Sequence, residues 1–336
     1  MRKSSKRATS ILCLWAALSS PGVANAGGFG LFEIATPDTG LAAAGTAARA
    51  QDASTVFTNP AGMTLLEVPT LQVGAQVTLG HFEFESDPSQ TTFAGNDGGN
   101  GYRPLPAGSF FYVHPFEDPE FMSLGIGISS YFALNMDFDE GWVGRYQAQQ
   151  LQLITYSIMP AVSFQVAKVF SFGVGFNFLV GYLDDRAAVN NIDPSLDDGR
   201  LEYSDVSLGA GFDVGMMFEI SERTRLGLRY LSPVRLDFEN EVEFSGLGPA
   251  RMAQLEMAGL IDAELEVEIR VPQSLMLSIY HAFDHTWAIM GNVGWEDWRQ
   301  FGELELTVDS DNPSSLVVDR DYKSTAHVAV GARVRP

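Results

Sequence analysis

The feature that most constrains this chain is a period-two alternation in which large apolar side chains are separated by glycine, serine or charged residues. Between Met122 and Leu134, most even positions are large and apolar, whereas the odd positions carry Ser, Gly, Tyr and Ala. The same alternation recurs in residues 170–182 and 206–218. Less regular runs occupy residues 71–81, 107–113, 154–166, 226–238, 265–283, 287–306 and 322–334. Since successive side chains of a β-strand point to opposite faces, the sequence predicts about ten amphipathic strands.

Both a soluble β-sandwich and a membrane β-barrel show this alternation, and the lengths of the connections distinguish them. Long connections occupy residues 84–106, 135–150, 183–205, 239–264 and 307–321. Short connections alternate with them at residues 114–121, 167–169, 220–224 and 284–286. Long outer loops and tight periplasmic turns are typical of outer-membrane barrels. The predicted fold class is therefore all-β, a transmembrane antiparallel β-barrel.

The composition agrees with a barrel that faces lipid. Hydrophobic residues make up 46% of the chain and aromatic residues 11%. No stretch approaches the 18 unbroken apolar residues that indicate a transmembrane helix. Aromatic residues near the ends of the expected strands would form interfacial girdles, although ordinary core aromatics would show the same pattern. These residues are Tyr182, Tyr203, Tyr230, Trp287, Trp295, Trp298 and Tyr322.

The first 26 residues have the features of a secretory signal peptide, although a frayed basic terminus is the alternative. A basic start precedes an apolar run at residues 8–18 and a small-x-small cleavage site at residues 24–26. This segment carries Cys13, the only cysteine, and four of the 21 Lys and Arg residues, so its removal changes the formal charge from −21 to −25. The acidic remainder is a poor partner for nucleic acid and has no disulfide or thiolate site.

Residues 27–67 differ in composition from the expected strands, because they are rich in glycine, alanine and short polar side chains. Exposed to lipid, such an irregular segment would leave backbone donors unsatisfied, so it must lie inside protein or water. The Asn-Pro-Ala-Gly-Met sequence at residues 59–63 lies near its end. We therefore predict a signal peptide over residues 1–26, an N-terminal hatch over residues 27–67 and a barrel over residues 68–336.

Nothing in the sequence indicates an enzyme, a cofactor or a metal. The five histidines lack metal-ligand spacing, and no nucleophile elbow or phosphate loop is present. Acidic residues in the outer loops also lack the spacing of a calcium loop. A solvated surface that faces cation-bridged lipopolysaccharide is therefore favoured over a specific calcium site. These acids are Asp184, Asp185, Asp193, Asp197, Asp198, Asp309 and Asp311.

Arg225, Arg229 and Arg235 stand on the expected lumen face of one strand. The planar guanidinium fork suits a carboxylate ligand. The favoured alternative is that these arginines neutralise acids of the lumen or plug, namely Asp213, Glu264, Glu266, Glu268, Glu33 and Asp52. A short amphipathic helix within residues 246–261 would either collect a hydrophobic ligand or pack on neighbouring loops.

Short motifs recur in order along the chain. The first are Gly27-Gly28-Phe29, Gly40-Leu41-Ala42-x-Ala44-Gly45, Asp52-Ala53-Ser54-Thr55 and Asn59-Pro60-Ala61-Gly62-Met63. Further on come Trp142-x-Gly144-Arg145-Tyr146, Tyr230-x-Ser232-x-Val234-x-Leu236-x-Phe238, Val271-Pro272-Gln273 and Trp295-x-x-Trp298-x-x-Phe301. Together these motifs resemble those of FadL-type outer-membrane transporters of long-chain fatty acids and other hydrophobic compounds.

The resemblance implies a fourteen-stranded barrel with an N-terminal hatch, in the outer membrane of a Gram-negative bacterium. A long-chain fatty acid or apolar small molecule would enter a groove among the outer loops and reach an internal pocket. It would leave sideways where the third strand kinks inward, so uptake is ligand-gated passive diffusion without covalent chemistry. The protein is expected to be a monomer surrounded by membrane lipid and lipopolysaccharide. The implied ligand-binding and gating residues are Gly28, Phe29, Asn59, Pro60, Ala61, Tyr131, Phe132, Ala133, Arg145, Arg225 and Arg229.

Two departures from the family pattern change these expectations. At the kink, Tyr131 and Ala133 stand where relatives often carry proline and glycine. The chain also has about ten strands, and a barrel of that size has little room for a hatch of about 40 residues. We therefore expect a truncated sequence, or an open or partner-completed sheet. The alternatives to transport are a structural or adhesive barrel and a non-functional truncated transporter.

Overall fold

The computed structural model of the chain describes Gly30, Ile34 and residues 36–334, apart from residues 88, 90, 92, 262, 310–313 and 320. The expected signal peptide (residues 1–26) and the candidate residues Gly28 and Phe29 lie outside the described residues. In the described part of the chain, no helix is long and apolar enough to cross a membrane.

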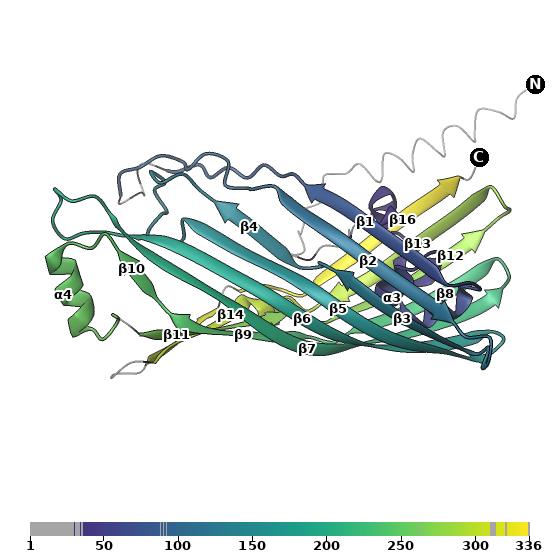
Figure 1. The fold of residues 1–336 in the computed structure, drawn as a ribbon. Coiled ribbons are helices and arrows are strands. Elements are labelled where there is room, and N and C mark those ends of the chain that lie inside the picture. The colour runs from purple at the N-terminus through teal and green to yellow at the C-terminus, as the bar shows by residue number, and fades with distance from the viewer. Residues whose placement is uncertain are drawn as a thin grey trace, which may run out of the picture.

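Ten strands of the described chain form an antiparallel wall in the order β1-β2-β3-β5-β6-β7-β8-β12-β13-β16 (Figure 1). Their bounds are β1 (Thr70–Thr78), β2 (Leu105–Pro115), β3 (Met122–Ser129), β5 (Gln150–Ala167), β6 (Phe170–Val189), β7 (Gly199–Ser221), β8 (Thr224–Leu231), β12 (Ser274–Ala282), β13 (Trp287–Glu296) and β16 (Thr325–Val334). Two further strands join this sheet, since β4 (Ala133–Asp137) pairs with β5 and β10 (Glu243–Ser245) pairs with β7. The predicted antiparallel all-β fold is confirmed.

The two ends of this sheet are β1 and β16. Among the described residues, β1 pairs only with β2 and β16 only with β13, so the sheet does not close on itself. A closed ten-stranded barrel around the N-terminal segment is therefore not formed, as the small lumen of such a barrel predicts.

The side chains of the wall alternate in the orientation predicted for a surface that faces lipid. The large apolar side chains point outward, so that Phe176 is 59% and Leu208 70% exposed. On the opposite face Ser171 and Asn177 are fully buried. A soluble β-protein would bury the large residues instead, so this arrangement fits a membrane wall.

The expected aromatic girdle is partly wrong. Trp287 and Trp295 are exposed near strand ends, as an interfacial position requires. Trp298 and Tyr203, in contrast, are only 1% and 3% exposed and belong to the interior. Periodicity could not separate the two groups, because an interior aromatic near a strand end has the same sequence signature.

The short turns and the long loops lie at opposite ends of the molecule (Figure 1). The short turns are residues 116–121, 168–169, 222–223 and 283–286, close to the predicted positions. Two long connections are shorter than predicted. The β6–β7 hairpin extends outward to a loop of residues 190–198, and the hairpin of β14 (Glu303–Asp309) and β15 (Ser314–Asp319) occupies most of residues 307–321.

A second sheet has the strand order β15-β14-β11-β9, with β11 at Glu264–Val271 and β9 at Val234–Glu241. β9 follows β8 after a break that contains Pro233, and β11 leads into β12 through a break that contains Pro272. Proline has no N–H to give to a ladder, so each long predicted strand divides at its proline.

The second sheet folds over the lumen faces of β6 and β7. A Cβ at Gly181 would lie 2.8 Å from Leu236 Cδ1, and one at Gly209 would lie 2.3 Å from the Arg235 carbonyl oxygen. Val234, Leu236 and Phe238 of β9 are buried in this contact, whereas Arg235 lies on the opposite, exposed face. The expectation that Arg235 shares the lumen with the other two arginines is therefore wrong, because the chain folds over at Pro233.

Residues 36–66, here called the lumen segment, form four short helical turns: η1 (Pro37–Leu41), α2 (Thr46–Arg49), α3 (Thr55–Thr58) and η2 (Pro60–Leu65). They contact the inner faces of β3, β5, β6, β7, β8 and β12. Alanine and glycine are frequent here because small side chains let the backbone of the segment approach the wall closely.

Two further helices lie elsewhere. α4 (Pro249–Met257) forms within the predicted stretch at the end of the molecule that carries the long loops (Figure 1). None of its residues is buried, so it lies on the surface of the loops rather than in a core. α5 (Arg299–Gly302) separates β13 from β14.

Candidate functional site

Asn59 links the lumen segment to the wall. Its Nδ2 donates hydrogen bonds to the carbonyl oxygens of Ala47 at 2.6 Å and Met216 at 3.1 Å, and its Oδ1 accepts one from the Ala61 N–H at 3.1 Å. Pro60 follows as the first residue of η2, where the missing N–H of proline is tolerated. The Asn-Pro-Ala motif thus caps a helical turn and fixes it to β7.

Glycines of the wall provide room for the lumen segment. A Cβ at Gly173 would lie 2.5 Å from Ala61 N, one at Gly215 would lie 2.0 Å from Asn59 Oδ1, and one at Gly227 would lie 1.8 Å from the Ala47 carbonyl oxygen. All three distances are too short for any side chain. These three glycines are therefore part of the surface on which the lumen segment rests.

Side chains of the wall also donate to and accept from the backbone of this segment. Ser278 accepts from Ala47 N at 3.1 Å, and Asn292 accepts from Gly45 N at 3.0 Å. Arg225 donates from Nη2 to the carbonyl oxygen of Arg49 at 2.7 Å, and its guanidinium lies over the ring of Tyr280. Arg225 therefore anchors the lumen segment in this structure.

The third strand of the wall is interrupted at the predicted kink. β3 ends at Ser129 and β4 begins at Ala133, so residues 130–132 lie between the two strands. The ladder between β2 and β3 stops at the pair Ser109 and Ser129. Pairing with the β4 stretch begins again only before residue 104, where Arg103 N donates to the Asn135 carbonyl oxygen and Tyr102 forms a bridge with Met136. Among the described residues, the wall thus lacks a ladder over this stretch.

Residues of the interruption point into the lumen. Tyr131 accepts a hydrogen bond from Asn177 Nδ2 at 2.9 Å, and its ring lies 5.3 Å from that of Phe57. Phe132 stacks on Trp298 at 6.0 Å, and its backbone forms a bridge with Gly30. The beginning of the described chain therefore meets the kink directly.

A cavity lies between the lumen segment and this part of the wall. The space between its lining atoms amounts to about 730 Å³, open solvent at its mouth included. Its lining is mostly apolar and comes from segments far apart in the chain. The lining residues are Gly30, Ala43, Thr46, Phe57, Thr58, Tyr131, Phe132, Arg229, Leu231, Val271, Pro272, Ser274, Met276, Glu296 and Trp298. A concave apolar space with a few polar groups is the usual form of a small-molecule site.

Arg229 is the cation among the described residues that line this cavity, and it is already paired. Its Nε and Nη2 lie 2.8 Å and 2.7 Å from one oxygen, Oδ2, of Asp213, which is fully buried. Its guanidinium also lies 4.4 Å from the centre of the Phe57 ring. The structure thus agrees with the favoured prediction that Asp213 neutralises a lumen arginine.

A second apolar space opens among the outer loops. This groove of about 1020 Å³, counted to open solvent, is lined by aromatic side chains, three of which are well exposed. Its lining residues are Phe82, Phe84, Thr91, Phe93, Met136, Phe138, Trp142, Val143, Gly144, Tyr146 and Gln147. It lies where the family resemblance implies a hydrophobic groove.

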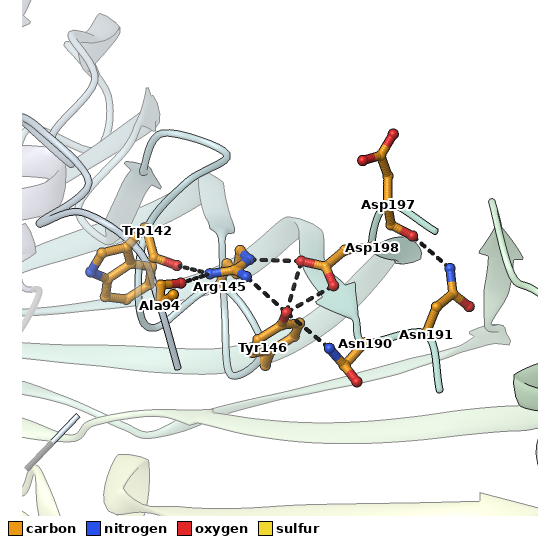
Figure 2. A network of polar contacts seen from close by, with 8 residues as sticks. All are labelled: Ala94, Trp142, Arg145, Tyr146, Asn190, Asn191, Asp197 and Asp198. Atoms are coloured by element: carbon orange, nitrogen blue, oxygen red, sulfur yellow. Dashed lines mark hydrogen bonds and ion pairs between the residues drawn. The ribbon is translucent and has the colours of Figure 1, made fainter. Parts of the chain in front are cut away.

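Arg145 borders this groove and joins three outer loops (Figure 2). Its Nε contacts Asp198 at 2.8 Å, its Nη1 donates to the Ala94 and Trp142 carbonyls at 3.1 Å and 3.0 Å, and its Nη2 donates to Tyr146 at 2.8 Å. Four of its five N–H groups are therefore used within the protein, so Arg145 holds the three loops together.

The remaining outer loops carry several acidic side chains. Among the described residues, no group of three or more His, Cys, Asp or Glu side chains is placed to hold a metal ion. Asp197 and Asp198 lie in the loop of Figure 2, whereas Asp184 and Asp185 belong to strand β6.

The structure brings together some of the predicted site residues and separates others. Tyr131, Phe132 and Arg229 line one cavity, while Ala133 lies beside it in β4. Asn59, Pro60, Ala61 and Arg225 hold the lumen segment in place, and Arg145 lies in the outer loops. Sequence reasoning missed Asp213 as the specific partner of Arg229. It also missed Ser274, Glu296 and Trp298 as lining, although Ser274 directly follows the motif at residues 271–273 and the other two lie within the motif at residues 295–301.

The fold and site define a membrane β-barrel wall with an internal segment that fills its lumen and an apolar cavity between them. A family model described as "Outer membrane protein transport protein (OMPP1/FadL/TodX)" matches residues 17–334. Outer membrane protein P1 of Haemophilus influenzae is 25% identical, over 97% of this chain and 78% of that protein. The long-chain fatty acid transport protein of Escherichia coli O6:H1 is 24% identical, over 90% of this chain and 73% of that protein.

Solved structures show the same fold. A Pseudomonas aeruginosa FadL homologue superimposes with a TM-score of 0.76 at 20% identity, over 91% of this chain and 77% of that one. The Ralstonia pickettii toluene transporter TbuX gives a TM-score of 0.65 at 16% identity, over 93% and 83% of the two chains. The chain belongs to the FadL/TodX family of transporters of hydrophobic compounds, in the outer membrane of Gram-negative bacteria.

Proposed function

We propose that this protein takes up apolar or amphipathic small molecules across the outer membrane by ligand-gated passive diffusion. Long-chain fatty acids and hydrocarbons are the compound class, since relatives carry the names of a long-chain fatty acid transport protein and a toluene transporter. The observation that carries the proposal is the position of the apolar cavity, because Tyr131 and Phe132 line it and also lie in the interruption of the wall.

The proposed route has three stages. The exposed aromatic side chains of the outer groove first collect a ligand from the medium, since burial of apolar area drives such binding. The ligand then moves to the cavity beside the lumen segment. It leaves sideways into the membrane between β2 and the kink, where the described wall has no ladder to separate the cavity from lipid.

The lumen segment acts as a hatch in this proposal. It fills the lumen beside the cavity and is bound to the wall by the buried hydrogen bonds of Asn59, Ser278 and Asn292. In this role the segment limits the passage of water and hydrophilic solutes, while an apolar ligand needs only the cavity and the side opening.

Uptake by whole cells tests the proposal. Cells without other transporters of this family are supplied with radiolabelled 1-dodecanol, with and without the protein. We expect the protein to raise the initial uptake rate, and Ser274→Trp, which fills the cavity, to return it to background. Ser221→Trp, in an exposed position at the end of β7, is the control and leaves uptake unchanged. Equal uptake with and without the protein would contradict transport and favour the structural or adhesive alternative.

A further inference from the structure

The cavity has few charged groups. Of the described residues that line it, only Arg229 and Glu296 carry a side chain that is charged at neutral pH in water. Arg229 is largely buried, with 12% of its side chain exposed, and Asp213 behind it is fully buried. The charge that a ligand meets therefore depends on whether Asp213 neutralises Arg229.

The positive charge of Arg229 is neutralised from behind. Two of its nitrogens approach Asp213 Oδ2 at 2.8 Å and 2.7 Å, and the Phe57 ring covers the guanidinium. Asp213 Oδ1 accepts no hydrogen bond within the described chain, so Arg229 is the group that compensates the buried carboxylate. Because breaking a buried ion pair leaves an uncompensated charge, Asp213 does not release Arg229 readily.

A carboxylate ligand in this cavity would therefore be the second anion beside one guanidinium. Like charges that share a site repel each other strongly. Glu296 also lines the cavity, and its Oε2 accepts a hydrogen bond from Trp298 Nε1 at 2.8 Å. Whether Glu296 is protonated or ionised, it supplies no positive charge.

The remaining polar groups of the described lining are uncharged. Thr46, Thr58, Ser274 and Tyr131 contribute hydroxyl groups among apolar side chains. These groups suit a ligand that is wholly apolar or that carries one hydroxyl group. They offer nothing to balance the charge of a carboxylate.

We infer that the cavity selects uncharged ligands, namely hydrocarbons and their alcohols, over carboxylates of the same chain length, and that Asp213 determines this selectivity. The inference rests on the proposed function, since it concerns the ligand of the same cavity. Asp213 is a specificity residue that acts through Arg229, because only Arg229 lines the cavity.

The test is equilibrium binding of radiolabelled 1-dodecanol and dodecanoate to the full chain in lipid nanodiscs at neutral pH. The wild type is expected to bind dodecanol at least about tenfold more tightly. Asp213→Asn keeps the side-chain shape, frees the charge of Arg229, and is expected to shift the affinity ratio at least about tenfold toward dodecanoate. Asp237→Asn, which removes the same charge from an exposed ion pair on β9, leaves the ratio unchanged.

A double variant, Asp213→Asn with Arg229→Gln, separates charge from shape. With both charges removed it should retain the preference of the wild type for dodecanol. Equal or tighter binding of dodecanoate by the wild type overturns the inference while leaving the proposed function intact, and so does an unchanged ratio in folded Asp213→Asn. Failure of the wild type to bind either ligand overturns both.

Discussion

The side-chain amide of Asn59 donates a hydrogen bond to the backbone carbonyl of Met216, 3.1 Å away on β7. Asn59 is almost fully buried, and the same amide satisfies two further backbone groups of the lumen segment. One side chain thus holds the segment in its own conformation and against the wall. The geometry explains why an asparagine, with both donor and acceptor, stands before the proline.

Asn59→Ala removes these hydrogen bonds and leaves buried backbone groups without partners. Since a buried unpaired group costs about 1–3 kcal/mol, we expect the free energy of unfolding to fall by at least about 2 kcal/mol. Urea titration of the protein in micelles, followed by tryptophan fluorescence, measures the change. Asn240→Ala is the control, because that amide donates to the Ser204 carbonyl in an exposed position, and an equally large loss there would contradict the role of Asn59.

Gly173 and Gly175 form a matched pair on one face of β6. A Cβ at Gly173 would meet Ala61 N at 2.5 Å, whereas a Cβ at Gly175 would find ordinary contact with Ala161 Cβ at 3.5 Å. We expect Gly173→Ala to displace η2, destabilise the protein by about 1–3 kcal/mol and let hydrophilic solutes leak in a liposome-swelling assay. Gly175→Ala should do neither, and similar behaviour of the two variants would show that η2 does not rest on Gly173.

Arg145→Ala should loosen the outer loops without affecting the wall. The side chain is 14% exposed and joins loops that contain Ala94, Trp142 and Asp198. Proteinase K added to intact cells is expected to cut these loops several times faster in the variant. Arg200→Ala removes an exposed arginine with longer ion pairs and serves as the control. Equal cleavage of both variants would contradict the role of Arg145 in holding the loops together.

The wall could be predicted from the sequence because its physical cause is local. Alternation along a strand such as residues 170–182 determines which face meets lipid, and the turn lengths determine which end faces the periplasm. The breaks at Pro233 and Pro272 could be predicted from the prolines themselves. The second sheet that follows from these breaks depends on contacts with Gly181 and Gly209, which lie far away in the chain.

The cavity could be predicted only in part. Tyr131 and Phe132 were predicted from the position of the family's kink, and Arg229 from its position on a strand. Arg229 pairs with Asp213 rather than with another acid because of the register between β7 and β8. That register could not be predicted from the pattern of residues. The interior position of Trp298 likewise follows from α5, a short helix that interrupts a run with strand periodicity.

The lumen segment can be tied to the wall without touching the cavity. Thr64 Oγ1 donates to Ser171 Oγ at 2.9 Å, so cysteines at these two positions would place their sulfur atoms within reach of a disulfide. The chain has one natural cysteine, Cys13, within the predicted signal peptide, so no other thiol of the expected mature protein would compete.

The most direct test of the proposed route is the initial rate of dodecanol uptake by cells that carry the oxidised Thr64→Cys/Ser171→Cys protein, with and without Ser274→Trp. If ligand passes through the cavity and leaves sideways, the cross-linked protein takes up dodecanol at the rate of the wild type, and addition of Ser274→Trp abolishes uptake. Loss of uptake on cross-linking that reduction restores would contradict this route, because the ligand would then need the lumen segment to move aside.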